Sequence, residues 1–333
     1  MTASLLAQLD RYPVILTEGA VIERIRRETS LQLDPYLLNT GLIYSTAGRA
    51  AMAQIYSQYI RIAAVHRLPI LVAAPTWRAN PQRVKQAALG DVSTVNHDAV
   101  RFMRDVCHAC DSRTSPVMVG GLMACRGDAY QPQEALDTPS AEAFHRPQAR
   151  SLAIAGVDYI MAATLPALPE AIGLARVLAS LPVPYIISFI VQRDGSILDG
   201  TPLALAIEQI DDQVDPRPAF YMVNCVHPDT VVTGLGAALT EKGLLRNRLW
   251  GIQANTSAKN PEELDGSDDL DTAEPEPFAD KMATLHTQFG LKVLGGCCGT
   301  NHRHIEAIAK RMSAARPHRF EATKDRTDSA DIH

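Results

Sequence analysis

The chain has 333 residues, of which 46% are hydrophobic, and a formal net charge of -5. This is the composition of a globular protein with enough length for two domains or for one large α/β barrel. The absence of a basic stripe argues against nucleic acid, no apolar run reaches the ~20 residues that span a bilayer, and the N-terminus lacks a signal-peptide pattern. Six cysteines are too few for a disulfide framework in so long a chain, so we expect free thiols in the reducing cytoplasm.

Short apolar runs alternate with helical patterns along the whole chain. The expected strands are residues 14–17, 69–74, 116–121, 157–162, 184–189, 219–224, 249–254 and 291–294. The expected helices are residues 46–66, 81–89, 95–111, 140–155, 168–180 and 302–315. Strands that are apolar throughout and alternate with helices are typical of a parallel sheet covered by helices. Eight such units predict a single-domain α/β protein, a (β/α)8 TIM barrel over residues 1–320, with a doubly wound open sheet as the alternative.

Two polar regions are expected to lie outside the barrel. Residues 262–276 are rich in Asp and Glu, with Gly and Pro among them, which indicates a solvated loop after the seventh strand. Because this loop would lie on the face where the strands end, it is a candidate mobile cover for a site there. Residues 321–333 form a polar tail that we expect to be disordered.

Three cysteines follow predicted strands. Cys225 ends the apolar run 219–224, and Cys297 and Cys298 lie in the glycine-rich stretch 294–300 after the last strand. Adjacent cysteines do not easily bond to each other because so small a ring is strained, but a turn can aim both sulfurs at one point. Three converging thiolates suit a zinc ion, and an open fourth position is typical of catalytic zinc.

The active site of a barrel lies at the carboxyl ends of its strands, where polar side chains also fall. Glu18, Thr76 and Asn224 each follow a predicted strand, and Trp77 comes next to Thr76. Asn224 and Thr76 are candidates to orient a substrate, and Trp77 offers a π face to a cationic one. Glu18 is a candidate substrate contact, although it can also satisfy main-chain donors at the strand end.

Purely structural roles are the alternative to these assignments. The three cysteines can be buried free thiols that pack as small hydrophobic residues. The other cysteines and histidines are expected to be structural, with Cys107 and Cys110 in a helix, although a C-x-x-C spacing also occurs in redox and metal sites. For His145 alone, a catalytic role stays as open as an orienting or packing role. The residues in question are Cys107, Cys110, Cys125, His108, His145, His302 and His304.

The stretches 224–225 and 295–300 resemble the zinc-ligand motifs of the homocysteine S-methyltransferase family. Weaker likenesses occur in the family's order at residues 16–20, 144–148, 155–158, 187–189, 198–201 and 304–305. The resemblance implies a zinc-dependent (β/α)8 barrel that transfers a methyl group to the sulfur of homocysteine and makes methionine. It also implies that Cys225, Cys297 and Cys298 hold Zn²⁺, and that the donor is S-methylmethionine, S-adenosylmethionine, betaine or methyl-cobalamin.

The chain departs from the family pattern at two positions. Glu18 stands where the family usually has Asp, and Ala163-Thr164 stands where the family usually has Glu-Thr. Those two acids are expected to hold the amino group of homocysteine. The loss of one removes a charge-assisted contact of ~1.5–3 kcal/mol. We therefore expect the reaction class to be kept, while homocysteine itself is open.

The expected chemistry is transfer of methyl from a sulfonium or related donor to a zinc-held thiolate, which needs neither a general base nor a covalent enzyme intermediate. A zinc hydrolase is the less favoured alternative, because three thiolates weaken zinc as a Lewis acid and no H-x-x-x-H motif occurs. A non-catalytic or re-purposed zinc barrel is another. The expected partners are a small-molecule thiol and a methyl donor, with no nucleic acid and no membrane. A homo-oligomer and a separate cobalamin-carrying protein stay open.

Overall fold

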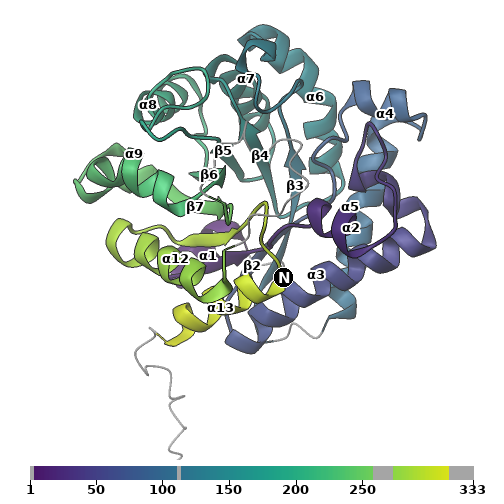
Figure 1. Cartoon of the computed structure of the whole chain (residues 1–333). Helices are drawn as coiled ribbons and strands as arrows, with labels where there is room; N and C mark the ends of the chain where they lie inside the picture. Colours follow the sequence, from purple (N-terminus) through teal and green to yellow (C-terminus); the bar gives the residue numbers. More distant parts are fainter. Residues whose placement is uncertain (1–3, 111–113, 258–272, 315–333) are drawn as a thin grey trace, which may run out of the picture.

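Eight parallel strands close into a barrel in which β1 to β8 follow one another in chain order (Figure 1). This computed structural model describes residues 4–110, 114–257 and 273–314. The strands are β1 (Ile15–Thr17), β2 (Ile70–Ala73), β3 (Val117–Met123), β4 (Tyr159–Leu165), β5 (Tyr185–Phe189), β6 (Phe220–Val226), β7 (Leu249–Ala254) and β8 (Val293–Gly296). The barrel closes where Ile15 and Leu16 pair with Val293 and Leu294. The predicted (β/α)8 barrel in a single domain is confirmed.

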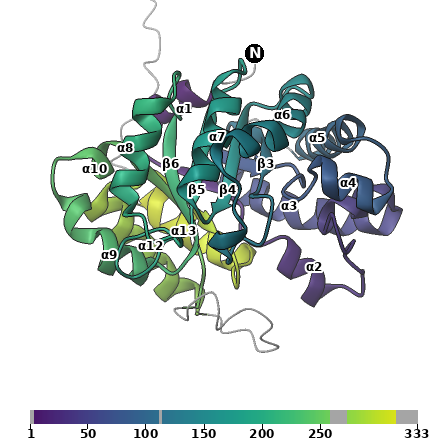
Figure 2. The same cartoon turned by 90° about the horizontal axis from the view of Figure 1, so that it is seen from above.

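Helices surround the barrel on its outer face (Figures 1 and 2). Those between β1 and β4 are α2 (Ile22–Glu28), the 3-10 turn η1 (Asn39–Tyr44), α3 (Thr46–His66), α4 (Pro81–Ala87), α5 (Val92–Ala109), η2 (Pro132–Glu134) and α6 (Thr138–Ile154). The later ones are α7 (Leu168–Ala179), α8 (Leu203–Gln213), α9 (Pro228–Thr240), α10 (Leu244–Arg248), α12 (Pro275–Phe289) and α13 (His302–Ala314). α1 (Leu5–Arg11) precedes the first strand.

The hydrophobic core has an inner and an outer part. Inside the barrel, side chains from alternate strand positions pack with Leu5 and Leu9 of α1, so this helix covers the end of the barrel at which the strands begin. Tyr159 fills part of the interior and is 1% exposed. Its ring lies where a Cβ on Gly120 would be, so β3 needs a glycine there. The outer part lies between the strands and the surrounding helices.

Strand and helix predictions agree with the structure to within a few residues at each end. The structure adds helices α1, α2, α8, α9, α10 and α12, which the sequence pattern did not indicate. Two predictions fall largely on residues that the structure does not describe. They are the acidic loop, whose residues 262–272 lie outside the described ranges, and the tail 321–333. Across residues 4–110, 114–257 and 273–314, no helix is long and apolar enough to cross a bilayer.

Candidate active site

Three cysteine sulfurs meet at the carboxyl end of the barrel. Cys225 lies near the end of β6, and Cys297 and Cys298 directly follow β8. Their Sγ atoms all lie within 4.8 Å of one another, and those of Cys225 and Cys297 are 2.7 Å apart. A tetrahedral zinc ion with Zn–S bonds of ~2.3 Å keeps its sulfur ligands about 3.8 Å apart. The three sulfurs are close enough together to bind one thiophilic metal ion. Cys225 is buried while Cys298 is exposed, so one side of such an ion would be open to solvent.

Irregular backbone at the end of β6 aims Cys225 at the other two sulfurs. Cys225 has a φ of 53°, and Thr164 at the end of β4 has a φ of 57°. The strand register shifts at both places, between Asn224 and Val226 and between Ala162 and Leu165. Such bulges redirect side chains, and a non-glycine residue in the left-handed region costs ~1–3 kcal/mol. Strained backbone at both strand ends is typical of a functional site.

Asn224 connects the irregular ends of β4 and β6. Its Oδ1 accepts hydrogen bonds from the Thr164 main-chain N (2.9 Å) and from Ser188 Oγ (2.6 Å). Its Nδ2 donates to Cys225 Sγ at 3.5 Å. Trp77 Nε1 donates to Thr164 Oγ1 at 3.0 Å. A chain of hydrogen bonds therefore runs from Trp77 across β4 to the cysteine cluster.

Main-chain hydrogen bonds fix the turn that carries the adjacent cysteines. The N–H of Cys297 donates to the carbonyl oxygen of Ala254 at 2.8 Å. The N–H of Cys298 donates to Asn255 Oδ1 at 3.1 Å. Both acceptors belong to the end of β7 and the residue after it, so the strand between the two cysteine-bearing strands sets the position of both thiols.

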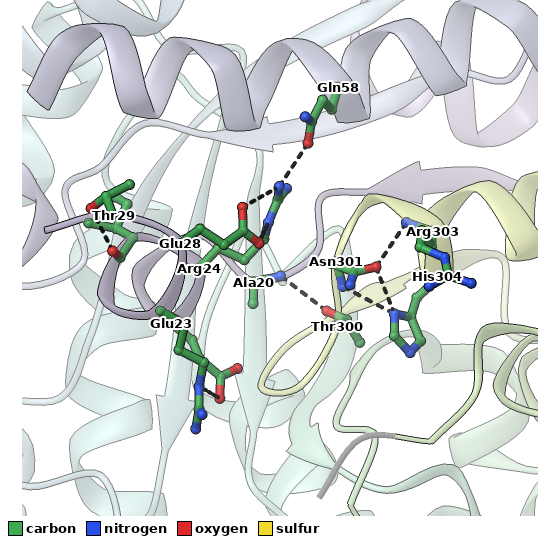
Figure 3. A network of polar contacts seen from close by, with 12 residues as sticks. Ala20, Glu23, Arg24, Glu28, Thr29, Gln58, Thr300, Asn301, Arg303 and His304 are labelled. Carbon is green, nitrogen blue, oxygen red and sulfur yellow. Dashed lines mark hydrogen bonds and ion pairs between the residues drawn. The ribbon is translucent and has the colours of Figure 1, made fainter. Parts of the chain in front are cut away.

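The glycine after the two cysteines completes this turn. Gly299 has a φ of +79°, and a Cβ there would overlap the hydroxyl of Thr256. Its N–H donates to Glu23 Oε2 at 2.5 Å. The next residue, Thr300, accepts a hydrogen bond from Ala20 N at 3.1 Å, which Figure 3 shows together with Glu23. The turn after β8 is thus attached to the segment after β1, across the closure of the barrel.

The three thiols of the cluster shift one another's pKa values. Hydrogen bonds with Cys297 and Cys298 lower the pKa of Cys225 well below its usual value, and the Asn224 amide and the Tyr130 hydroxyl donate to its sulfur as well. The same contact with Cys225 raises the pKa of Cys297 and raises that of Cys298 to about 12. A metal cation that binds the three sulfurs would displace their protons.

Tyr130 is a site residue that the sequence did not reveal. It lies in the loop after β3, where Asp128 Oδ1 accepts a hydrogen bond from its N–H at 3.0 Å. Tyr130 also lines a cavity of about 510 Å³ together with Gln192 and Leu198. Its hydroxyl also contacts Cys225. Tyr130 is therefore a link between this cavity and the cysteine cluster. No spacing or motif in the sequence marks Tyr130.

Glu18 lies just after β1 and is only 7% exposed. Its Oε1 accepts a hydrogen bond from Ala73 N at 3.1 Å. Burial raises the pKa of its carboxyl group to about 7, and hydrogen bonds from main-chain N–H groups oppose that rise. Within the described residues no cationic side chain forms an ion pair with Glu18, so its carboxylate is available to a cationic ligand.

The other predicted substrate contacts are engaged in part with the protein itself. Thr76 is fully buried, and its hydroxyl both donates to the carbonyl oxygen of Leu122 and accepts from its N–H, each at 2.9 Å. Trp77 is partly exposed, but the guanidinium carbon of Arg78 lies 4.3 Å from its ring centroid. One face of the indole ring is therefore already covered by a cation. Ala163, where an acid was expected, is 5% exposed and packs in the inner core.

Comparison with known proteins bears on the fold and on the reaction class. The family model described as homocysteine S-methyltransferase matches residues 15–312. Homocysteine S-methyltransferase YbgG of Bacillus subtilis is 23% identical over 314 residues, which are 90% of this chain and 95% of that protein. Homocysteine S-methyltransferase 2 of Saccharomyces cerevisiae is 29% identical over 133 residues, 38% of each chain.

Solved structures show the same barrel. The metallated form of the homocysteine methyltransferase MmuM from Escherichia coli superposes with a TM-score of 0.73 at 20% identity, over 92% of this chain and 98% of that one. Its oxidized form gives the same TM-score over 91% and 97%. At this level of identity the likeness concerns the fold, whereas the family match spans nearly all of the barrel. The predicted methyltransferase class is thereby confirmed, and the chain belongs to the homocysteine S-methyltransferase family.

Proposed function

We propose that this protein is a zinc-dependent S-methyltransferase that moves a methyl group from a sulfonium donor to a small thiol. The donor is S-methylmethionine or S-adenosylmethionine, and the thiol is homocysteine or a close relative. The observation that carries the proposal is the convergence of three cysteine sulfurs within 4.8 Å at the mouth of the barrel. Cys225, Cys297 and Cys298 would hold the zinc ion, in keeping with a reducing cytoplasm.

When bound, zinc supplies a means of holding the acceptor sulfur as a thiolate at neutral pH, where a free thiol of pKa ~8.5 is mostly protonated. The protein contributes orientation and charge. The Asn224 amide and the Tyr130 hydroxyl both donate to Cys225, which fixes the sulfur on the buried side of the cluster. The exposed Cys298 leaves the opposite side for the two substrates.

The transfer itself is a single displacement. A bond forms between the acceptor sulfur and the methyl carbon while the bond from that carbon to the cationic sulfur of the donor breaks. The electron pair of the broken bond stays on the donor sulfur, which becomes a neutral thioether, and the proton of the acceptor thiol goes to solvent. Alignment of the two sulfurs with the methyl group is the main demand on the protein.

We assign Glu18 to the ammonium group of an amino-acid substrate. The carboxyl group is buried, has no ion-pair partner among the described residues, and has a pKa raised to about 7. A bound ammonium ion would stabilise its ionised form. We also assign Thr76, Trp77 and Asn224 to the substrate site, because each lies at or just after the end of a strand on this face of the barrel.

A second candidate is a barrel of the same family whose acceptor is not homocysteine. Ala163 favours it, because a buried methyl group replaces a carboxylate that would share the ammonium ion with Glu18. A thiol without an amino group would then be the better substrate. This alternative keeps the zinc site and the reaction class, and it differs only in the acceptor.

The test compares homocysteine with 4-mercaptobutyrate, which has the same thiol and carboxylate but lacks the amino group. Zinc-loaded protein is offered each thiol with S-methylmethionine and with S-adenosylmethionine, and the methylated product is quantified. We expect turnover with at least one pair, and loss of both bound zinc and turnover in Cys298→Ser. Cys107→Ala is the control, since Cys107 lies on α5 away from the cluster. A preference for 4-mercaptobutyrate would support the second candidate, and zinc-loaded protein inactive with every pair would contradict both.

A further inference from the structure

A second cavity, of about 670 Å³, lies beside the mouth of the barrel where the segments that follow β2 and β3 meet. Three arginines line it. Arg78 comes two residues after Thr76, Arg83 lies on α4, and Arg126 follows β3. Trp77, which donates to Thr164 on the catalytic face, lines the same cavity. Trp77 therefore stands between this arginine pocket and the substrate position.

The arginines of this pocket donate to main-chain oxygens rather than directly to carboxylates. Each guanidinium group donates to main-chain carbonyl oxygens, which carry no net charge. The bonds are Arg78 Nη1 to Cys125 O (3.2 Å) and Gly127 O (2.7 Å), Arg83 Nη1 to Tyr36 O (3.2 Å), and Arg126 Nη2 to Glu134 O (3.2 Å). Among residues 4–110, 114–257 and 273–314, none of the three forms an ion pair with a carboxylate. The remaining N–H groups of each fork are suited to a carboxylate or a phosphate.

The arginines also affect one another. Arg78 is only 7% exposed. The pKa of Arg83 is lowered by burial and by the positive charge of Arg78, while Asp128 opposes the shift, so Arg78 and Arg83 lie in one electrostatic environment. An anion bound between them would relieve this repulsion.

Two acidic side chains line the pocket as well, but both are engaged with the main chain of the loop. Glu134 Oε2 accepts from Asp128 N at 3.0 Å, and Asp128 Oδ1 accepts from Tyr130 N at 3.0 Å. Cationic side chains therefore outnumber anionic ones in this cavity, although the whole chain has a net charge of -5. A local excess of positive charge in an acidic protein points to an anionic ligand.

The arginine pocket and the cysteine cluster belong to opposite strands of the barrel. Cys225 lies near the end of β6 and Cys297 directly follows β8, and β7 lies between those two strands. In a closed barrel of eight strands, β3 is the strand opposite β7. A displacement at carbon needs the acceptor sulfur, the methyl group and the leaving group in line. The leaving part of the donor must then extend away from the cluster, toward the strands that lead to the arginines.

We propose that the pocket formed by Arg78, Arg83 and Arg126 binds an acidic group, a carboxylate or a phosphate, on the non-reacting end of the methyl donor. This inference rests on the proposed function, because it assumes that a methyl donor occupies the space opposite the cysteines. It assigns the donor an acidic substituent and makes the arginine pocket a determinant of donor specificity. Trp77 separates the acidic end of the donor from its reacting sulfonium group.

The kinetic test uses two donors that differ in the acidic group. Dimethylsulfoniopropionate carries a carboxylate, and trimethylsulfonium carries none. In Arg83→Gln and Arg126→Gln we expect KM for dimethylsulfoniopropionate to rise about tenfold or more, the usual effect of losing one charge-assisted contact. KM for trimethylsulfonium and for the thiol should stay as in wild type. Arg101→Gln is the matched control, since Arg101 is exposed and pairs with Asp98 at the surface.

The pattern of losses decides the outcome. Equal losses with both donors, or no loss with either, would overturn the assignment. Arg78→Gln is less suitable, because Arg78 also holds the turn at Cys125 and Gly127, and its loss disturbs the loop that carries Tyr130. Among the described residues, the side chains of Arg83 and Arg126 each make a single hydrogen bond to the main chain, so their variants test the charge with less effect on folding.

A binding measurement separates this inference from the proposed function. Calorimetric titration of zinc-loaded and of metal-free protein with dimethylsulfoniopropionate and with inorganic pyrophosphate needs no turnover. Tighter binding of the first probe identifies a carboxylate ligand, tighter binding of the second identifies a phosphate, and either should weaken in Arg83→Gln and Arg126→Gln but not in Arg101→Gln. If no donor is turned over yet this pattern holds, the methyl transfer is refuted and the anion site stands. If wild type binds neither probe, the arginine pocket is not an anion site.

Discussion

Glu18 lies at the carboxyl end of the barrel, and the burial of its carboxyl group lowers the stability of the protein. Its folded-state pKa of about 7 lies above the ordinary value of 4.5 because the carboxyl group is buried. The folded protein therefore binds this proton more tightly than the unfolded chain does. Below pH ~4.5 Glu18 is protonated in both states and the free energy of unfolding is undiminished. As the pH rises toward 7 the unfolded chain loses this proton first, and the free energy of unfolding falls by about 3 kcal/mol in all.

Glu18→Gln should remove this loss, because the amide has no charge to bury. We expect the variant to gain about 3 kcal/mol relative to wild type at pH 8 and little at pH 5, while methyl transfer to an amino-acid thiol falls. Urea unfolding of metal-free protein at both pH values measures the difference. Glu142→Gln is the control, since Glu142 forms surface ion pairs with Arg146 and Arg176. Equal stability of Glu18→Gln and wild type at pH 8 would show that burying the ionised carboxylate does not destabilise the protein.

The sequence predicts the three thiols but not the groups that surround them. Cys225, Cys297 and Cys298 each follow an apolar run, so the barrel rule alone brings them to one face. Tyr130 and the arginine pocket depend on how loops after different strands fold back over the mouth. The left-handed φ of Cys225 depends on a bulge that arises from pairing with β7. Such long-range features leave no local pattern in the sequence.

The loop between β3 and α6 is held by a buried pair of side chains on α6 and α7. His145 on α6 and Glu170 on α7 are both fully buried, and His145 Nε2 lies 2.8 Å from Glu170 Oε1. The same carboxylate accepts hydrogen bonds from the main-chain N–H of Arg126 at 2.7 Å and of Leu136 at 3.2 Å. One side chain therefore positions both ends of the segment that carries Tyr130.

Glu170→Ala should leave two main-chain donors and His145 without an acceptor. Breaking a buried pair in this way costs ~3–5 kcal/mol, and we expect the free energy of unfolding to fall by about that amount in chemical denaturation. Glu142→Ala on α6 is the matched change, with an expected cost of ~0–1 kcal/mol because its ion pairs lie at the surface. Similar losses in the two variants would mean that the buried carboxylate does not anchor the loop. His145 matched a family position in the sequence, whereas its partner Glu170 had no signal.

Helices differ in how readily the sequence indicates them. α5 has a strong alternation of apolar and polar faces, and its predicted range differs from the observed Val92–Ala109 by only a few residues. α9 was missed. Its sequence, PDTVVTGLGAALT, contains two glycines and several β-branched residues, which have low helix propensity. Packing on the barrel, rather than intrinsic preference, accounts for a helix there.

The closure of the barrel and the turn that carries Cys297 and Cys298 depend on neighbouring residues of β8. β8 pairs with β1 through Leu294 and Leu16, and the next residue, Gly295, faces Thr17. A Cβ on Gly295 would overlap the Thr17 hydroxyl, which also accepts a hydrogen bond from Gln253 at 3.1 Å. The first and last strands can approach closely only because Gly295 has no side chain. Eight alternating units predicted the barrel, but the sequence did not show how its seam closes.

Gly295→Ala should therefore disturb stability and the metal site together. Overpacking costs ~1–3 kcal/mol, and β1 must move away from β8 to admit the methyl group, which shifts the turn that begins at Cys297. We expect a lower melting temperature and weaker zinc binding in competition with a chelating dye. Gly243→Ala is the control, because a Cβ at Gly243 meets open space. A Gly295→Ala variant that loses stability yet binds zinc as tightly as wild type would show that the cysteine turn is independent of the seam, and that β7 alone positions the thiols.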